Sequence, residues 1–197
     1  MGIKTVSYKL ICDDKFHGIL FKIDQELAQE AESSDCPYCY HQLHHADYPR
    51  SPNGIPANQR HHYEHRFSFC CSKCRKRVTP ETVRFFGRRW YPAAAFLLVC
   101  ILHLGITDKR IEQIKRHLGI RVNKLTWERW RLWWQDAFEL TLFWKQAKGH
   151  LSKQPASKFL IARSILRIFS GSLSDKMLHL LRFLSPLTGR IYRGIYG

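Results

Sequence analysis

Two pairs of closely spaced cysteines constrain the fold of this 197-residue chain more than any other feature. Cys36 and Cys39 form one C-x-x-C pair, and Cys71 and Cys74 form a second about thirty residues later. A C-x-x-C turn lets both thiolates face one metal while backbone N–H groups point at the sulfur atoms. Two such turns predict one tetrahedral zinc site. Because four thiolate ligands leave no open position for a catalytic water, we expect the zinc to be structural.

Three neighbouring residues leave alternatives open for this site. Cys70 stands beside Cys71 and would give a three-residue spacing, whereas the shorter spacing of Cys71 matches that of the first pair. His44 or His45 is a further candidate for a replacement ligand. Four unligated thiols are the remaining alternative.

The start of the chain and its longest apolar run bear on the compartment. The first ten residues hold no long apolar stretch behind a basic start, so we expect no secretory signal peptide. The apolar run 93–104 is too short to cross a bilayer and contains His103, so it predicts a buried helix. We therefore expect a cytoplasmic protein without a transmembrane segment, whose cysteines serve as metal ligands or core thiols more than as disulfides.

Charge is the second strong constraint. The chain has 32 Lys and Arg against 16 Asp and Glu, a formal net charge of +16, which indicates a polyanionic partner, either nucleic acid or an anionic membrane surface. Cationic residues gather around the second cysteine pair, interleaved with aromatic residues. A solvated charged face is the plain alternative, but we predict phosphate contacts for Arg66, Arg75, Lys76, Arg77, Arg84, Arg88 and Arg89.

These residues together resemble a known family. The run Cys36-Pro-x-Cys39, followed by Arg66-Phe-x-Phe-Cys-Cys-x-x-Cys74-Arg-Lys-Arg-Val-Thr-Pro80, is similar to the zinc-ribbon head of bacterial insertion-sequence transposases and of small proteins encoded near such elements. The resemblance covers roughly residues 36–86. It implies zinc-dependent DNA binding connected with mobile elements, followed in many members by a helix-turn-helix.

From Pro92 onward the apolar pattern becomes helical. It predicts helices over 93–104, over 108–118 after the cap Thr107, and over 124–148 after the cap Asn123. The second helix and the start of the third resemble a helix-turn-helix. An ordinary helical hairpin without DNA contact is the alternative.

The two faces of the segment beginning at residue 124 have different predicted roles. One helical face is apolar and is expected in the core: Trp127, Trp130, Trp134 and Ala137. Three cationic residues lie largely off that stripe and are predicted to contact DNA: Lys124, Arg129 and Arg131.

The C-terminal part contains a predicted linker, 149–157, and two basic amphipathic helices, 158–169 and 174–184. Such helices bind anionic lipid in some proteins, but they more often pack against a neighbouring helix or a second subunit. We therefore expect packing or dimerisation rather than membrane binding.

No catalytic domain is predicted. After Glu139 the only side-chain carboxylate is Asp175, so the acidic triad of a metal-ion recombinase has no place in the C-terminal third. An HNH-type nuclease is a weaker alternative, because the proline-rich loop between the cysteine pairs would interrupt the hairpin such a site requires; its residues would be His45, Asp47, Asn58 and His62. A zinc ribbon that binds RNA or an acidic protein is the third alternative.

The sequence thus predicts an α+β protein: a small zinc ribbon followed by a mostly helical region with a helix-turn-helix-like pair. Its segments are an N-terminal leader (1–35), the zinc ribbon with a basic extension (36–91), the helical region (92–148) and the C-terminal basic helices (149–197). The expected function is zinc-dependent binding of double-stranded DNA as an accessory or regulator of a mobile element. A second copy of the chain or a transposase is the expected kind of protein partner.

Overall fold

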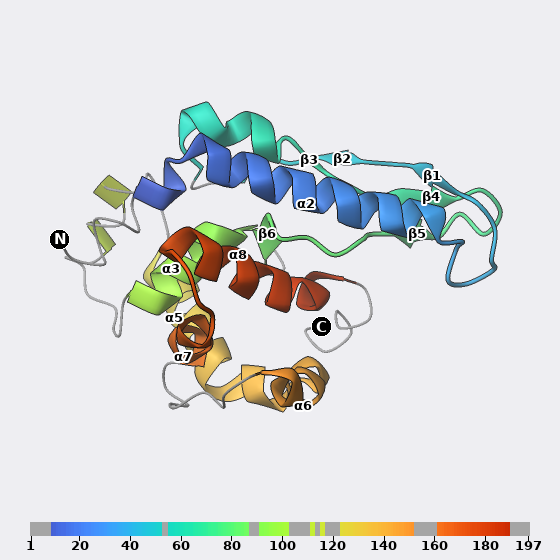
Figure 1. The fold of residues 1–197 in the computed structure, drawn as a ribbon. Coiled ribbons are helices and arrows are strands. Elements are labelled where there is room, and N and C mark those ends of the chain that lie inside the picture. The colour runs from blue at the N-terminus through green and yellow to red at the C-terminus, as the bar shows by residue number, and fades with distance from the viewer. Residues whose placement is uncertain are drawn as a thin grey trace.

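The structure, a computed structural model, combines helices with small antiparallel sheets, so the α+β class is confirmed (Figure 1). It describes residues 9–52, 55–86, 91–102, 111–112, 115–116, 123–151 and 161–189, with the backbone alone over 98–102. Of the predicted first helix of the helix-turn-helix, 108–118, most residues lie outside this set, as do its cap Thr107 and the basic residues Arg88 and Arg89. The helix-turn-helix therefore stays a prediction.

The first long element is helix α2 (Asp14–Ser33), which follows the cap Asp13, whose side chain accepts a hydrogen bond from the Lys15 N–H at 3.0 Å. Phe16, Leu20 and Leu27 recur at helical spacing and are buried. Apolar residues of the predicted N-terminal leader, 1–35, thus form part of the core. In Figure 1, α2 reaches from the neighbourhood of α3 to strands β1, β4 and β5.

The cysteine-bearing sheet has the order β1-β4-β5 and is antiparallel throughout. Its strands are β1 (Leu43–His45), β4 (Phe69–Cys71) and β5 (Arg77–Val78). A second antiparallel pair consists of β2 (Tyr48–Pro49) and β3 (His65–Arg66). The alternation from Arg66 to Phe69 predicts a continuous strand. The structure has two strands there, β3 and β4, because the Asp47 carboxylate accepts a hydrogen bond from the Ser68 N–H at 2.8 Å between them. A separate pair, β6 (Phe85–Phe86) and β7 (Tyr91–Pro92), leads into α3.

The remaining helical elements are η1 (Ala57–Tyr63), α3 (Ala93–Leu102), α5 (Lys124–Leu132), η2 (Trp133–Ala137), η3 (Phe138–Leu140), α6 (Leu142–Ala147), η4 (Lys148–His150), α7 (Ile161–Ile168), α8 (Leu173–Leu184) and η6 (Ser185–Thr188). Two caps explain where helices begin. The Asn123 side chain accepts the Thr126 N–H at 2.7 Å, as predicted, and Ser172 forms a capping box with Asp175.

One predicted helix is wrong in its extent. The segment 124–148 is interrupted by a π turn and a 3-10 turn, and Thr141 is extended with ψ of 144°. Its hydroxyl donates to the Phe138 carbonyl at 2.7 Å and accepts the Trp144 N–H at 3.0 Å, so it ends one helical run and caps the next. The π turn widens the helix where Trp133 and Trp134 both pack against the core.

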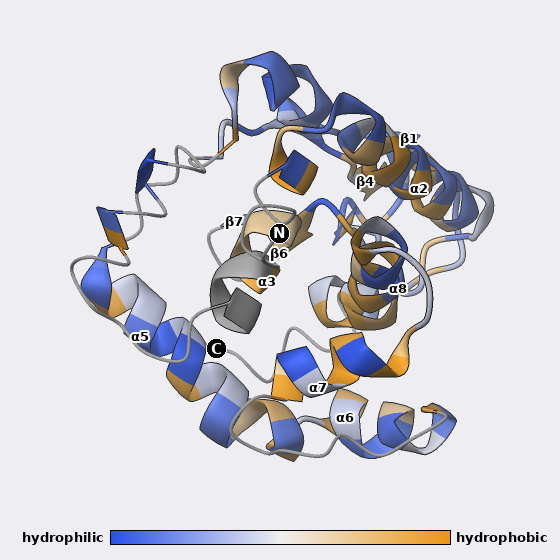
Figure 2. Ribbon diagram, turned by 60° about the vertical axis from the view of Figure 1, so that its left-hand side comes forward, coloured by the Kyte–Doolittle hydropathy of each residue, from blue (hydrophilic) through white to orange (hydrophobic). Residues whose placement is uncertain are grey.

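The main hydrophobic core joins α2 to α3, the tryptophan-bearing segment, α7 and α8. Trp127 and Trp134 are buried, as predicted, while Trp130 packs on the core from its edge. Hydrophobic and hydrophilic residues alternate along α2, α7 and α8 in Figure 2, as amphipathic helices require. The two C-terminal helices are therefore packing elements. Within the described part of the chain, no helix combines the length and hydropathy needed to cross a bilayer.

Candidate metal centre and basic surface

The four predicted cysteines converge at one place. The Sγ atoms of Cys36 and Cys74 are 3.6 Å apart, those of Cys39 and Cys71 are 3.3 Å apart, and all four lie within 4.8 Å of one another. Cys36 and Cys71 are buried, and the other two are half-buried. A cluster of four sulfur atoms with this spacing could hold a metal ion.

The two C-x-x-C turns, which we call the first knuckle (Cys36–Cys39 and the residue Tyr40) and the second knuckle (Cys71–Cys74 and Arg75), have matching backbones. The Cys36 N–H donates to the His41 carbonyl at 2.9 Å, and the Cys71 N–H donates to the Lys76 carbonyl at 3.1 Å. The residue after each pair has a left-handed backbone, φ 56° at Tyr40 and 58° at Arg75. Equivalent turns thus aim both cysteine pairs at one point.

Two thiols of the cluster, those of Cys71 and Cys39, have very different pKa values. Burial works to raise the pKa of Cys71, but the backbone N–H groups of Cys74 and Lys73 and the thiols of Cys39 and Cys74 together outweigh burial and lower that pKa to about 6. At Cys39, burial and the neighbouring Cys71 thiol raise the pKa to about 12. A bound cation would remove this conflict because it stabilises all four sulfur atoms as thiolates.

The alternative ligands point elsewhere. The Cys70 thiol lies against the Arg75 carbonyl at 3.5 Å and is not part of the cluster. The His45 ring stacks on Phe69, and its Nε2 lies 3.1 Å from the Glu32 carboxylate. The cluster therefore consists of the four cysteines predicted from their spacing.

A small second core surrounds the cluster. Ala28 from α2, Leu43 from β1 and Phe69 from β4 are buried against Cys36 and Cys71. This core contains few apolar side chains apart from the cysteines themselves. Without the cluster, the sheet would therefore have little hydrophobic burial to stabilise it. The C-terminal half of α2 supplies the wall on which it packs.

The residues of the nuclease hypothesis are not brought together. Asp47 binds the Ser68 backbone, His45 faces Glu32, and His62 lies 3.1 Å from Asp14 instead. Among the described residues, the groups of side chains close enough to share a metal ion are the four cysteines and Asp14 with His61 and His62.

Two predicted phosphate contacts are corrected. Arg66 and Arg84 are both 0% exposed. Arg66 donates to the Pro80 carbonyl, and Arg84 Nε donates to the Asp24 carboxylate at 2.7 Å while its other nitrogens donate to the His62 and His65 carbonyls. These guanidinium groups tie backbone segments together and are withdrawn from any phosphate.

Asp24 is the residue that the sequence prediction missed. It is buried within α2 and accepts hydrogen bonds from the Thr82 hydroxyl, the Val83 N–H at 2.7 Å and Arg84. A signal was present, since Asp24 falls on the same helical stripe as Leu20 and Leu27. An acid within an apolar stripe indicates a buried partner of opposite charge.

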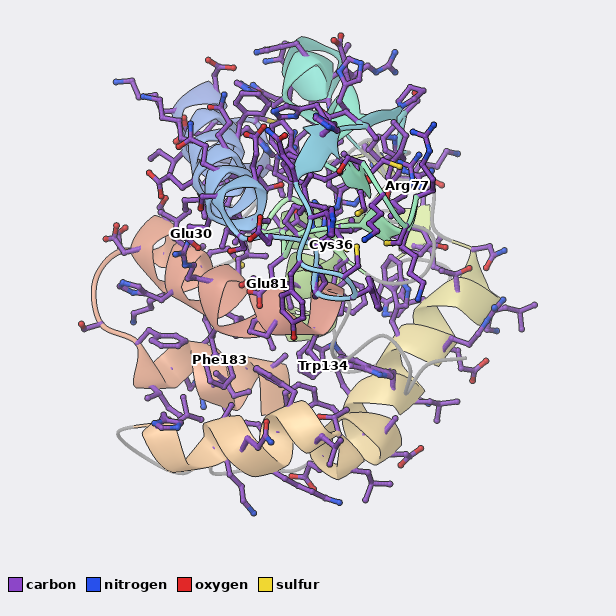
Figure 3. The ribbon with its side chains drawn as sticks, turned by 90° about the vertical axis from the view of Figure 1, so that its right-hand side faces the viewer. Glu30, Cys36, Arg77, Glu81, Trp134 and Phe183 are labelled. Atoms are coloured by element: carbon purple, nitrogen blue, oxygen red, sulfur yellow. The ribbon has the colours of Figure 1, made fainter. Side chains whose placement is uncertain are left out.

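The predicted phosphate contacts in and directly after the second knuckle remain accessible. Arg75, Lys76 and Arg77 are exposed, although Lys76 also lies over the Tyr38 ring at 4.4 Å and Arg77 donates to the Ala46 carbonyl at 2.6 Å. Figure 3 shows Arg77 and Glu30 on opposite sides of Cys36. On α5, Lys124 and Arg129 are exposed and Arg131 is half-buried.

Comparison of the chain with protein-family models, with curated proteins and with solved structures finds no match in any of the three.

Proposed function

We propose that this protein binds DNA through a zinc ribbon, formed by the sheet β1-β4-β5 and its two knuckles. Zinc suits a closed set of four thiolates, which is a soft tetrahedral donor set. With Zn–S bonds of about 2.3 Å, the sulfur atoms of a regular tetrahedron lie about 3.8 Å apart. The sulfur separations of 3.3 and 3.6 Å, and the limit of 4.8 Å for the whole set, support this ion.

The backbone of Arg75 is the observation that carries the DNA-binding part of the proposal. A left-handed conformation costs a residue other than glycine about 1–2 kcal/mol, and glycine would adopt it without that cost. Arg75 nevertheless stands there with its side chain exposed, and Tyr40, which is 80% exposed, stands at the matching position of the first knuckle. A strained backbone at a residue whose side chain is exposed is typical of residues that contact a ligand.

Charge supports a phosphate ligand on the same side. Four exposed residues make what we call the basic knuckle surface: Lys73, Arg75, Lys76 and Arg77. No acid occurs between His65 and Pro80. The exposed acids of the neighbouring α2, Glu26, Glu30 and Glu32, belong to a different element, with Glu30 on the far side of Cys36 (Figure 3). A polyanion is therefore attracted to one side of the ribbon.

A second contact is proposed on α5. Lys124 and Arg129 are exposed near the capped start and on the outer side of this helix, where they are available to a groove or to phosphates. We include in the proposal that α5 acts as the recognition helix of a helix-turn-helix. The likeness of the cysteine and arginine motifs to transposase heads supports the further proposal that the protein serves a mobile element as an accessory factor or regulator.

The test is a titration of labelled duplex DNA by fluorescence anisotropy at several salt concentrations. We expect binding that weakens steeply with salt. Arg75→Gly and Lys76→Ala should each lower the affinity and reduce the slope of log K against log salt by about 0.9 for each phosphate that the variant no longer neutralises. Tyr40→Gly should lower affinity without lowering the melting temperature, because glycine relieves the left-handed strain.

Lys22→Ala is the matched control, since Lys22 is an exposed lysine on α2, away from the knuckles. The proposal is wrong if this control weakens binding as much as Arg75→Gly does, or if the zinc-loaded protein does not bind duplex DNA. Stronger binding to RNA or to an acidic protein under the same conditions would favour those partners instead.

A further inference from the structure

We propose a second metal site at the other end of helix α2, formed by Asp14, His61 and His62, that binds a divalent transition metal ion such as Zn²⁺. Asp14 is the first residue of α2, and the two histidines belong to η1, which contacts that helix. Two imidazoles and one carboxylate form a donor set that suits zinc and its neighbours in the first transition series. This proposal is independent of DNA binding.

The distances agree with one shared ion. Asp14 Oδ1 lies 3.1 Å from His62 Nε2 and 3.9 Å from His61 Nε2, and the ligand atoms of all three residues are within 4.8 Å of one another. Zinc–nitrogen and zinc–oxygen bonds of about 2.1 Å in a tetrahedron place ligand atoms about 3.4 Å apart. The two measured separations lie on either side of that value.

The protein holds His62 in place. Its side chain is only 13% exposed, its ring packs against the Phe21 ring with centroids 6.1 Å apart, and its carbonyl accepts a hydrogen bond from Arg84. The buried Arg84 is in turn paired with Asp24, so the position of His62 is set by the core. A ligand fixed in this way loses little conformational entropy when it binds an ion.

His61 and Asp14 complete the site from the solvent side. The His61 ring lies against the His62 ring with centroids 3.9 Å apart, and the side chains of His61 and Asp14 are 59% and 68% exposed. Two imidazoles this close repel each other when both are protonated, whereas one cation binds both in their neutral form. The open side leaves room for water as a further ligand, so the ion should exchange more readily than one enclosed by four thiolates.

The proposed site is separate from the cysteine cluster. Helix α2 has 20 residues and is therefore about 30 Å long, with Asp14 at its start and Cys36 beyond its end. The donor atoms also differ, since one site offers nitrogen and oxygen and the other offers sulfur. The two sites can therefore be distinguished in one experiment by the spectrum of bound cobalt, which shows thiolate charge-transfer bands at the cysteine site alone.

The experiment measures how many Zn²⁺ and Co²⁺ ions the full chain binds, by calorimetric titration and elemental analysis, with optical spectra of the cobalt form. We expect two ions per chain, the second without thiolate bands. Asp14→Asn and His61→Ala should each reduce the count to one and leave the thiolate bands unchanged. His150→Ala, at an exposed histidine on η4, should still bind two ions.

Both test variants change exposed side chains, so each should fold, and far-UV circular dichroism checks that they do. A single ion per chain in the unaltered protein would overturn the proposal. A second ion that survives Asp14→Asn and His61→Ala together would also overturn it, because other residues would then be the ligands. Neither outcome bears on the cysteine cluster, which its thiolate bands report separately.

Discussion

At the scale of single residues, burial decides which arginines can meet a ligand. Arg75 and Arg84 lie nine positions apart in similar basic sequence, yet the first is exposed and the second is enclosed. Arg84 is enclosed because Asp24, in a distant part of the chain, neutralises its charge, while three aromatic rings surround its guanidinium carbon, those of Phe21, Phe67 and Phe85. A buried charge is stable only when it is paired in this way.

Asp24→Ala should lower the free energy of unfolding by about 3–5 kcal/mol, because it leaves Arg84 buried and unpaired. Denaturation in urea measures the change. The matched control is Glu26→Ala, an exposed acid on the same helix, for which we expect a change within about 0.5 kcal/mol. Equal losses of stability from the two substitutions would show that the ion pair does not stabilise the fold.

The same comparison explains which site residues the sequence could predict. The four cysteines are predictable because a C-x-x-C turn is a local structure, and the two turns reveal themselves by their spacing alone. The sequence predicts phosphate contacts for Arg66 and Arg84 because nothing within their own segment shows that Pro80 and Asp24 bind them. The position of Asp24 on the apolar stripe of α2 indicates a buried cationic partner, but the spacing does not show which residue that partner is.

At the scale of elements, the sequence indicates where helices begin better than where they are interrupted. The start of α5 is predicted from its cap Asn123, which is a local signal, and the start of α8 is predicted to within one residue from its amphipathic pattern. The apolar pattern does not reveal the break within 124–148, because apolar residues continue through it and only Thr141 marks the new helix start. The π turn that precedes it depends on how Trp133 and Trp134 pack, which is a tertiary effect.

Thr141→Ala should therefore destabilise the protein by about 0.5–2 kcal/mol, because the Trp144 N–H loses its cap. The measurement is again urea denaturation, with Ser170→Ala, an exposed serine that caps no described helix, as the control. If Thr141→Ala instead leaves the stability unchanged, then the Thr141 hydroxyl does not stabilise the start of α6.

At the scale of the whole molecule, the two hydrophobic cores differ in what holds them. The main core is built from many apolar side chains, whereas two of the five buried residues in the small core are cysteines of the cluster, and α2 contributes to both. Stability should therefore be uneven along α2, high near Leu20 and dependent on metal near Ala28.

Removal of the proposed zinc ion with a strong chelator should unfold the cysteine-bearing sheet and leave most helices folded, because thiolates without their ion repel one another. Hydrogen exchange would show the loss of protection in β1, β4 and β5, and circular dichroism would show the retained helix. Cys36→Ser should have the same effect, while Cys12→Ser, at an exposed cysteine outside the cluster, should have none. Simultaneous unfolding of all helices would mean that the cores are not separable.

The placement of acids on α2 and of cations on the second knuckle also has a kinetic consequence. Glu30 and Arg77 lie on opposite sides of Cys36 (Figure 3), so this end of the protein carries an electric dipole. In the field of a polyanion such a dipole experiences a torque and rotates before any contact forms. The protein then approaches the polyanion with its arginine-bearing side first. Because salt screens this field, added salt should lower the association rate constant more than it raises the dissociation rate constant.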